Sequence, residues 1–333
     1  MLDTFSAALT ALLSVLCIML AAVWLRRIGR IAPETDHGMM RLTVDFLLPC
    51  LIVDRILKSD AFSDVQNLWL PPLLGFGLTA VGIFLGFLVG VLPGKRTGLS
   101  TWKQKRTFAA CVGVLNYGFV PIPLVDVLFP NDFRTSGVLF LMYLGVEVSI
   151  WTLVLFSIKG KLSVKSWRHI FTMPVIAILV AVPLNLIGRE MPAAFHEHVV
   201  PCFDFLLAAF HMAGQAAIPS SLIVIGLTIS ELFHRKNFQD RWSVTLRIGT
   251  FSCLIRLLVM PLIYLILAVF LPCTVEIKRI LVIYGAMGSA IFPVVLAKHY
   301  NGHTETAFDT IMSNTLVSIV TLPIWIAVGL KMI

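Results

Sequence analysis

One apolar stretch of the sequence combines an amide, a phenol and three helix-breaking residues. Asn116 and Tyr117 are followed by Gly118, Pro121 and Pro123. Proline removes a backbone donor and glycine leaves helical geometry at little cost, so a helix through this stretch should be interrupted. Inside a membrane the freed N–H and C=O groups need partners, which a polar ligand can supply. The amide of asparagine suits a carboxylate ligand without fixing a charge of its own.

A second stretch repeats this pattern later in the chain. Gly288 and Ser289 precede Pro293, and Gly118–Gly288 and Pro123–Pro293 are each separated by 170 residues. Half-helices that begin at such interruptions present positive N-terminal ends, so they favour an anion. The predicted substrate-binding residues are Asn116, Tyr117, Gly118, Pro121, Pro123, Gly288, Ser289 and Pro293.

Ionisable residues inside apolar helices are costly and are therefore functional candidates. Asp45, Glu147 and Arg256 fall in this class, and the two acids are candidates for proton coupling. Arg256 either neutralises a carboxylate of the bundle, which we favour, or attracts an anionic ligand. Asp126 and Asp309 lie nearer helix ends, where we expect contact with water.

The elements that carry these residues must be membrane helices. Of the 333 residues, 58% are hydrophobic and 13% are charged, and the mean hydropathy is +0.91. Soluble domains carry about 25% charged residues, so this composition excludes a soluble enzyme, a disordered chain and a nucleic-acid binder. The apolar runs are continuous rather than alternating, which indicates helices and not a barrel. We predict ten spans, at 5–25, 39–57, 67–93, 107–128, 135–158, 170–188, 203–230, 245–272, 278–298 and 306–330.

The basic residues predict the orientation of these spans. Of the 26 Lys and Arg residues, 18 follow odd-numbered spans, seven lie on the opposite side and Arg256 lies within a span. Because cytoplasmic loops of membrane proteins are enriched in Lys and Arg, both termini should lie outside the cytoplasm. We expect a multi-pass protein of the cell (inner) membrane, with its first span uncleaved.

The 170-residue separation predicts an internal repeat. Pro49 and Pro219 share this separation and predict a further pair of interrupted helices. Five helices per repeat is an odd number, so the second copy enters the membrane from the opposite side. We predict a single membrane domain with one repeat in residues 1–160 and an inverted repeat in residues 161–333.

Other kinds of site are not expected. The six cysteines form no CxxC pair, and we find no phosphate-binding loop, HExxH motif or nucleophile elbow. We therefore expect no enzyme activity, no cofactor, no metal site and no nucleic-acid partner.

Several segments resemble one known family. Residues 115–124 read Leu-Asn-Tyr-Gly-Phe-Val-Pro-Ile-Pro-Leu, which is similar to the Asn-x-Gly-x-x-Gly-x-Pro signature of the auxin efflux carrier family. Residues 295–300 and 313–325 resemble the ends of that family's last two helices. Arg256 followed by Pro261 resembles its eighth helix. Pro121 departs from the signature, which has glycine there, and the family often has proline where Gly288 stands.

The resemblance implies an all-α polytopic fold of ten helices in two inverted five-helix repeats, with broken, crossing helices 4 and 9. It implies a scaffold part, a transport part and an elevator-like movement, and it places Asn116 at a carboxylate site. The expected activity is secondary active transport or uniport of a small organic anion, auxin-like or malonate-like. The short loop after the fifth span favours a compact bacterial-type carrier.

Two alternatives remain open. A sodium-coupled symporter of the bile-acid type has a similar fold, but it would need clustered acidic and amide groups near the crossing. A membrane sensor without transport activity is the other. The sequence leaves open the substrate, the direction of transport, the coupled ion (a proton is one candidate) and the oligomeric state, for which a homodimer is one option.

Overall fold

A computed structural model describes residues 2–92, 94–160, 168–191, 203–233 and 242–333. In these ranges every regular element is a helix, and the one β contact is an isolated bridge between residues far apart in the sequence. The helices of the first half are α1 (Leu2–Arg27), α2 (Thr35–Leu42), the π-helix η1 (Thr43–Leu47), α3 (Leu48–Lys58), η2 (Ala61–Ser63), α4 (Gln66–Val91), η3 (Gly94–Thr97), α5 (Trp102–Gly113), α6 (Pro121–Leu128), α7 (Phe133–Ser149), the π-helix η4 (Ile150–Val154) and α8 (Leu155–Lys159). Those of the second half are α9 (Met173–Glu190), α11 (Asp204–Phe233), α12 (Trp242–Cys253), the π-helix η8 (Leu254–Val259), α13 (Met260–Phe270), α14 (Val275–Ala286), α15 (Phe292–His299) and α16 (Thr304–Met332).

The helices agree with a protein that crosses a membrane several times. By length and composition, five are suited to span one: Gln66–Val91, Phe133–Lys159, Asp204–Ser230, Ser243–Phe270 and Thr304–Met332. Large apolar side chains such as Phe84, Phe205 and Phe270 are exposed on their outer faces. Exposed apolar surface of this extent needs a lipid or protein covering.

Proline explains two of the π-helical turns. Pro49 and Pro261 each stand just after such a turn, at the start of α3 and α13. A proline has no N–H for the carbonyl one turn earlier, so the local hydrogen-bond register widens there. Pro219, in contrast, lies inside the continuous α11. The predicted interruption at Pro219 is therefore wrong, because the surrounding helix absorbs the single missing hydrogen bond.

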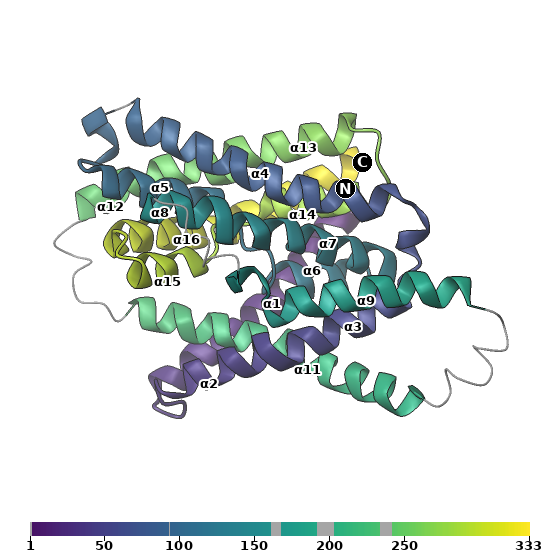
Figure 1. The fold of residues 1–333 in the computed structure, drawn as a ribbon. Helices are drawn as coiled ribbons and strands as arrows, with labels where there is room; N and C mark the ends of the chain where they lie inside the picture. The colour runs from purple at the N-terminus through teal and green to yellow at the C-terminus, as the bar shows by residue number, and fades with distance from the viewer. Residues whose placement is uncertain (1, 93, 161–167, 192–202, 234–241) are drawn as a thin grey trace.

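The helices form two groups, one above the other in Figure 1. In the group that we call the α1 group, α1 packs against α11, and α3 packs against α9 and α11. In the α4 group, α4 packs against α5 and α7, α12 packs against α16, and α13 packs against α14. Each group draws helices from both halves of the chain. The short helix α6 contacts both α1 and α7 and so lies between the groups.

Close backbone contacts hold the helices inside each group together. A Cβ placed on Gly145 of α7 would lie 1.9 Å from the Pro72 carbonyl oxygen of α4. A Cβ on Gly214 of α11 would lie 2.8 Å from the Leu51 Cα of α3 in the other group. These helices approach so closely that only hydrogen fits between them.

Replacing Gly145 with valine should therefore destabilise the α4 group. Overpacking of a tight core costs about 1–3 kcal/mol, so we expect a clear drop in the melting temperature of the detergent-solubilised protein. Gly77→Val is the matched control, because Gly77 lies on the adjoining α4 and has no atom within 4 Å of its Cβ position. Equal melting temperatures for the two variants would contradict this account of the packing.

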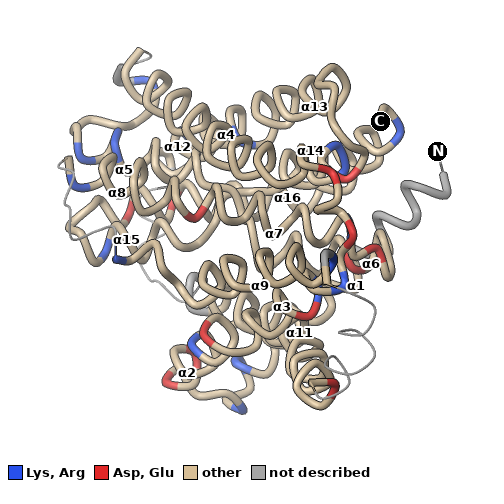
Figure 2. Tube along the Cα trace, turned by 45° about the vertical axis from the view of Figure 1, so that its right-hand side comes forward, with Lys and Arg blue, Asp and Glu red and all other residues tan. Residues whose placement is uncertain are grey.

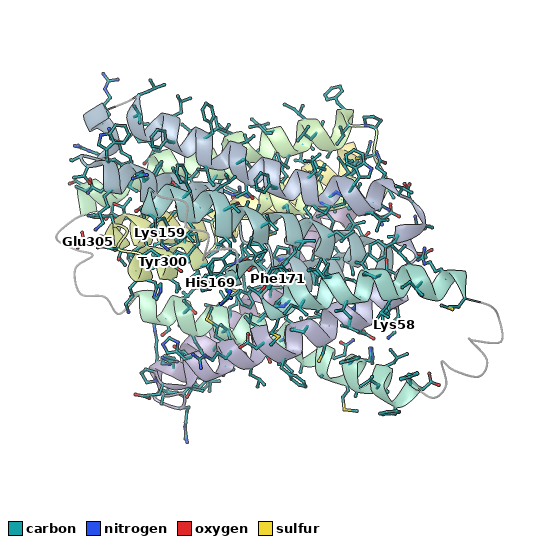
Figure 3. All side chains as sticks on the ribbon, in the orientation of Figure 1. Lys58, Lys159, His169, Phe171, Tyr300 and Glu305 are labelled. Atoms are coloured by element: carbon teal, nitrogen blue, oxygen red, sulfur yellow. The ribbon has the colours of Figure 1, made fainter. Side chains whose placement is uncertain are left out.

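The charged residues gather at the ends of the bundle. Figure 2 shows many Lys and Arg residues at the end where α5, α8 and α15 lie. At that end the Lys159 Nζ lies 3.7 Å from the centre of the Tyr300 ring, whereas Lys58 lies at the opposite end (Figure 3).

Candidate functional site

Two helices are interrupted where glycine and proline predict it. The first break separates α5, which ends at Gly113, from α6, which begins at Pro121. The second separates α14, which ends at Ala286, from α15, which begins at Phe292. Pro121 and Pro293 stand in the first turns of their half-helices, where a missing N–H costs no hydrogen bond. Pro123 also lies in the first turn of α6, and Gly118 lies in the break itself.

The two breaks contact each other through their backbones. Leu115 and Ser289 form an antiparallel bridge. The Asn116 N–H donates to the Gly288 carbonyl oxygen at 2.9 Å, and the Ala290 N–H donates to the Val114 carbonyl oxygen at 2.9 Å. These contacts bring the predicted residues of both halves together, although they lie far apart in the sequence.

The paired segments are related by a shift of 174 residues. This shift converts Val114 and Asn116 into Gly288 and Ala290, so each hydrogen bond becomes the other. The proline motif gave 170, and part of the difference arises because the second break, residues 287–291, is two residues shorter than the first, residues 114–120. The predicted separation of 170 residues relates the prolines that follow the breaks. The shift of 174 residues relates the residues that pair between the breaks.

Asn116 and Ser289 offer polar groups at this contact. The Asn116 side chain is half-buried and makes no hydrogen bond to any described residue. The Ser289 Oγ accepts a hydrogen bond from the Asn314 Nδ2 at 2.9 Å, which leaves the serine hydroxyl hydrogen free to donate. Asn314 is fully buried, and its Oδ1 has no partner in the described part of the chain. Sequence reasoning used Asn314 only for the family resemblance and missed its contact with Ser289.

Tyr117 connects the first break to Glu147. The Tyr117 Oη donates to Glu147 Oε2 at 2.7 Å, and the Trp151 Nε1 donates to Glu147 Oε1 at 3.1 Å. The Tyr284 Oη of α14 donates to the Tyr117 carbonyl oxygen at 2.8 Å. Glu147 is buried, with 4% of its surface exposed. Glu147, which was predicted as an intramembrane charge, is thus connected to the first break through the Tyr117 side chain.

Arg256 contacts the second break from η8. Its Nε donates to the Met287 carbonyl oxygen at 2.9 Å, and its Nη2 donates to the Tyr284 carbonyl oxygen at 3.1 Å. Its guanidinium carbon lies 5.9 Å from the centre of the Tyr264 ring. Among the described residues Arg256 forms no ion pair, so the carboxylate partner that we favoured is not found there. Carbonyl groups at the C-terminal end of α14 take its place.

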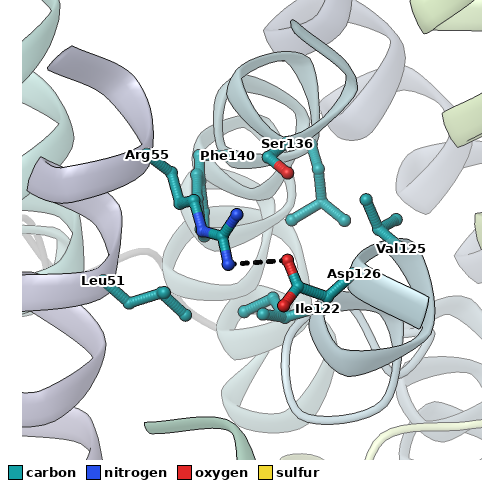
Figure 4. Close-up of a pocket in the computed structure, with 8 residues that line it drawn as sticks. Leu51, Arg55, Ile122, Val125, Asp126, Ser136 and Phe140 are labelled. Atoms are coloured by element: carbon teal, nitrogen blue, oxygen red, sulfur yellow. Dashed lines mark ion pairs between the residues drawn. The ribbon is translucent and has the colours of Figure 1, made fainter. Parts of the chain in front are cut away.

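The structure separates Asp45 from these contacts and corrects the expectation for Asp309. Asp45 is exposed on η1 and has no hydrogen bond or ion pair within the described ranges. Asp309 is buried rather than wet, and it accepts a hydrogen bond from Thr245 at 3.0 Å. Asp126 is partly exposed, in line with the expected contact with water, and the Arg55 Nη2 lies 2.7 Å from its Oδ1 (Figure 4). This ion pair joins α3 to α6.

The first break lies where the two helix groups meet. Phe119 and Val120, which follow Gly118, pack against a buried apolar cluster. The cluster consists of Val15 and Met19 from α1 and Leu222 and Ile225 from α11. The polar groups of the break therefore belong to the α4 group but lie directly beside the α1 group.

Comparisons with known proteins agree with this architecture. A family model described as "Membrane transport protein" matches residues 7–165 and 161–326. An uncharacterized transporter of Methanothermobacter thermautotrophicus is 25% identical over 322 residues, which cover 96% of this chain and 98% of the relative. The uncharacterized transporter YfdV of Escherichia coli K12 is 22% identical over 330 residues, which cover 96% of each chain. A YfdV protein of Shigella flexneri matches to the same extent.

Proposed function

The chain belongs to the membrane transport protein family, and we propose that it is a secondary carrier or uniporter of a small organic anion. The substrate is a carboxylate of the size range from malonate to an auxin-like acid. It binds where the two broken helices meet. The carrier works in the cell (inner) membrane by alternating access, with both of its termini outside the cytoplasm.

The observation that carries this proposal is the pairing of the two breaks beside an unpartnered amide. The half-helices α6 and α15 both begin there, so two positive helix ends meet at one place. The Asn116 amide and the Ser289 hydroxyl add donors for a carboxylate. Broken helices at matching positions of two halves are a known sign of a transporter binding site.

The contact between the breaks supports an inverted repeat. We group the helices into ten spans, with α1 to α8 as the first five and α9 to α16 as the second five. The two breaks lie at matching places in the two halves and pair in antiparallel direction, as a two-fold axis in the membrane plane would produce. The breaks then cross at that axis, near the middle of the membrane.

The division into two helix groups supports an elevator-type movement. Tight glycine contacts such as those of Gly145 and Gly214 hold each group together. Tightly packed groups move as units and slide along the surface between them. The α4 group carries the breaks, so it is the moving part, and the α1 group is the scaffold.

The ion pair between Arg55 and Asp126 should control this movement, because it joins the scaffold to α6. Replacing Asp126 with asparagine leaves the buried Arg55 without its charged partner. Breaking a fully buried pair costs about 3–5 kcal/mol, and this pair costs less because Asp126 is partly exposed. We expect a severalfold change in the initial rate of flux. The exchanged pair, Arg55→Asp with Asp126→Arg, should return the rate to within about threefold of wild type.

Lys58→Gln is the control for this prediction. Lys58 also lies on α3, but it pairs with Asp54 on the same helix and does not join the two groups. Its replacement should leave the rate unchanged. A rate in the exchanged double variant that is lower than in either single variant would contradict the role of the pair.

The proposed function is tested by flux into proteoliposomes. The purified protein is reconstituted, and uptake of radiolabelled malonate, succinate and indole-3-acetate is measured without a gradient, with a pH gradient and with a sodium gradient. Saturable uptake of one acid supports the carrier. Export of an anion is driven by a negative-inside potential alone, whereas import needs a coupled ion. Accumulation that follows the sodium gradient would favour the bile-acid-type alternative, and no uptake in any arm would overturn the proposal.

A further inference from the structure

Arg256 is a buried cation without a buried anion beside it. It is fully buried, and among the described residues its partners are the Tyr284 and Met287 carbonyls and the Tyr264 side chain. Arginine stays protonated in proteins. Taking such a charge out of water is expensive unless opposite charge compensates it. The compensation found here is partial, because a helix C-terminus carries only about half a negative charge.

At the corresponding place in the first half, the described residues include no such cation. Arg256 falls at Gly82 under the 174-residue offset of the bridge and at Gly86 under the 170-residue separation of the proline motifs, so both offsets place a glycine of α4 there. A Cβ on Gly82 would lie 2.9 Å from the Gly113 Cα at the end of α5. Gly82 thus packs against the end of α5, and Arg256 contacts the end of α14. In the first half a glycine packs against a glycine. In the second half a guanidinium donates a hydrogen bond to a carbonyl oxygen.

This difference changes the charge of the place where the breaks meet. The C-terminal ends of α5 and α14 and the N-terminal ends of α6 and α15 all lie there. Their partial charges, two negative and two positive, sum to about zero over the whole meeting point, although a ligand at the starts of α6 and α15 faces the positive ends. Arg256 adds one full positive charge at the end of α14, and no charge is added at the end of α5. The described acid nearest to the first break is Glu147, which does not lie at the break itself but is connected to it through the Tyr117 hydroxyl.

We propose that Arg256 determines the charge selectivity of the carrier. By neutralising the C-terminal end of α14, it leaves the meeting point of the breaks positive and makes an anion the preferred ligand. It acts through the α14 carbonyls and does not touch the substrate. The inference rests on the proposed function, and it assigns the preference for an anion to one residue of the second half of the chain.

The experiment compares acids with neutral amides of the same shape. Binding to the purified protein is measured by calorimetry for malonate and malonamide, and for indole-3-acetate and indole-3-acetamide. In Arg256→Gln we expect the ratio of acid to amide affinity to fall about tenfold, since a charge near a helix end contributes on that scale. Arg256→Lys keeps the charge and should keep the ratio within about threefold, even where the melting temperature falls.

A second variant covers the case in which Arg256→Gln does not fold. Arg256→citrulline keeps the shape of the side chain and its donors to Met287 and Tyr284 but removes the charge. It should lower the acid-to-amide ratio as Arg256→Gln does. Tyr264→Phe is the control, because it alters the surroundings of the guanidinium and leaves the charge in place.

The outcomes separate this inference from the proposed function. An unchanged acid-to-amide ratio in a folded, uncharged variant would overturn the role of Arg256 and leave the carrier standing. A fall in Arg256→Lys equal to that in the uncharged variants would also overturn it, because geometry and not charge would then be responsible. Failure of the wild-type protein both to bind and to transport any of the acids would overturn the proposed function and the inference with it.

Discussion

Replacing Asn116 with alanine should reduce carboxylate flux by about tenfold to a hundredfold and leave the fold intact. Within the described protein the Asn116 side chain has no hydrogen-bond partner, so its removal costs the fold little. The bound carboxylate loses amide donors, and hydrogen bonds to a charged group contribute about 1.5–3 kcal/mol each. The effect should therefore be seen in the affinity and the rate, not in the melting temperature.

The measurement is the initial rate of uptake in proteoliposomes, beside the melting temperature of each variant. Asn185→Ala is the contrasting control, because the Asn185 Nδ2 donates to the Ile56 and Ser59 carbonyl oxygens at 2.9 Å. Its removal should lower the melting temperature because it takes away the hydrogen bonds that join α9 to the end of α3. Wild-type flux in a well-folded Asn116→Ala protein would show that the substrate site lies elsewhere.

The position of Asn116 was predictable because it depends on local chemistry. Gly118, Pro121 and Pro123 fall within six residues and weaken helical hydrogen bonding at one place, which favours a break there. The five helices that are long and apolar enough to cross a membrane were predictable for a similar reason, since the length of an apolar run is a property of the run. The interruption predicted at Pro219 failed because one proline removes one hydrogen bond, and α11 tolerates that loss.

The partners of the buried polar groups were not predictable, because most of them are backbone atoms. Arg256 binds carbonyl groups at the end of α14, and any residue type provides a carbonyl. Tyr284 binds the carbonyl of Tyr117 for the same reason. The contact of Asn314 with Ser289 depends on where α16 crosses the second break, which a single sequence does not specify. Asn314 is a polar residue inside an apolar helix, and this feature of the sequence could have identified it as a candidate site residue.

The structure also distinguishes between the two acids that were candidates for proton coupling. Glu147 is buried, and through Tyr117 it contacts the break that holds Asn116. Asp45 is exposed and has no partner in the described ranges. As a carboxylate, Glu147 accepts hydrogen bonds from Tyr117 and from Trp151. A proton on Glu147 turns one carboxylate oxygen into a hydroxyl, which donates and accepts more weakly, so it weakens one of these hydrogen bonds. Movement of Tyr117 would pass the change to its neighbour Asn116.

Glu147→Gln should therefore abolish the response of transport to a pH gradient. With the membrane potential clamped at zero, one proton per substrate gives about tenfold accumulation for each unit of pH difference, since one unit corresponds to about 1.4 kcal/mol. The wild-type protein should accumulate substrate to this extent, and Glu147→Gln should only equalise the two sides. The measurement is the steady-state ratio of internal to external substrate.

Two controls test whether Glu147 alone carries the proton. Asp45→Asn removes the exposed acid and should leave accumulation as in the wild type. His169→Gln removes the titratable ring that stacks on Trp151, with 5.1 Å between the ring centres, and should also leave it unchanged. Loss of accumulation in His169→Gln, with Glu147→Gln still responding to the gradient, would assign the proton to the histidine.

Tyr117→Phe should weaken accumulation without abolishing it, because the carboxylate remains but its connection to the break is lost.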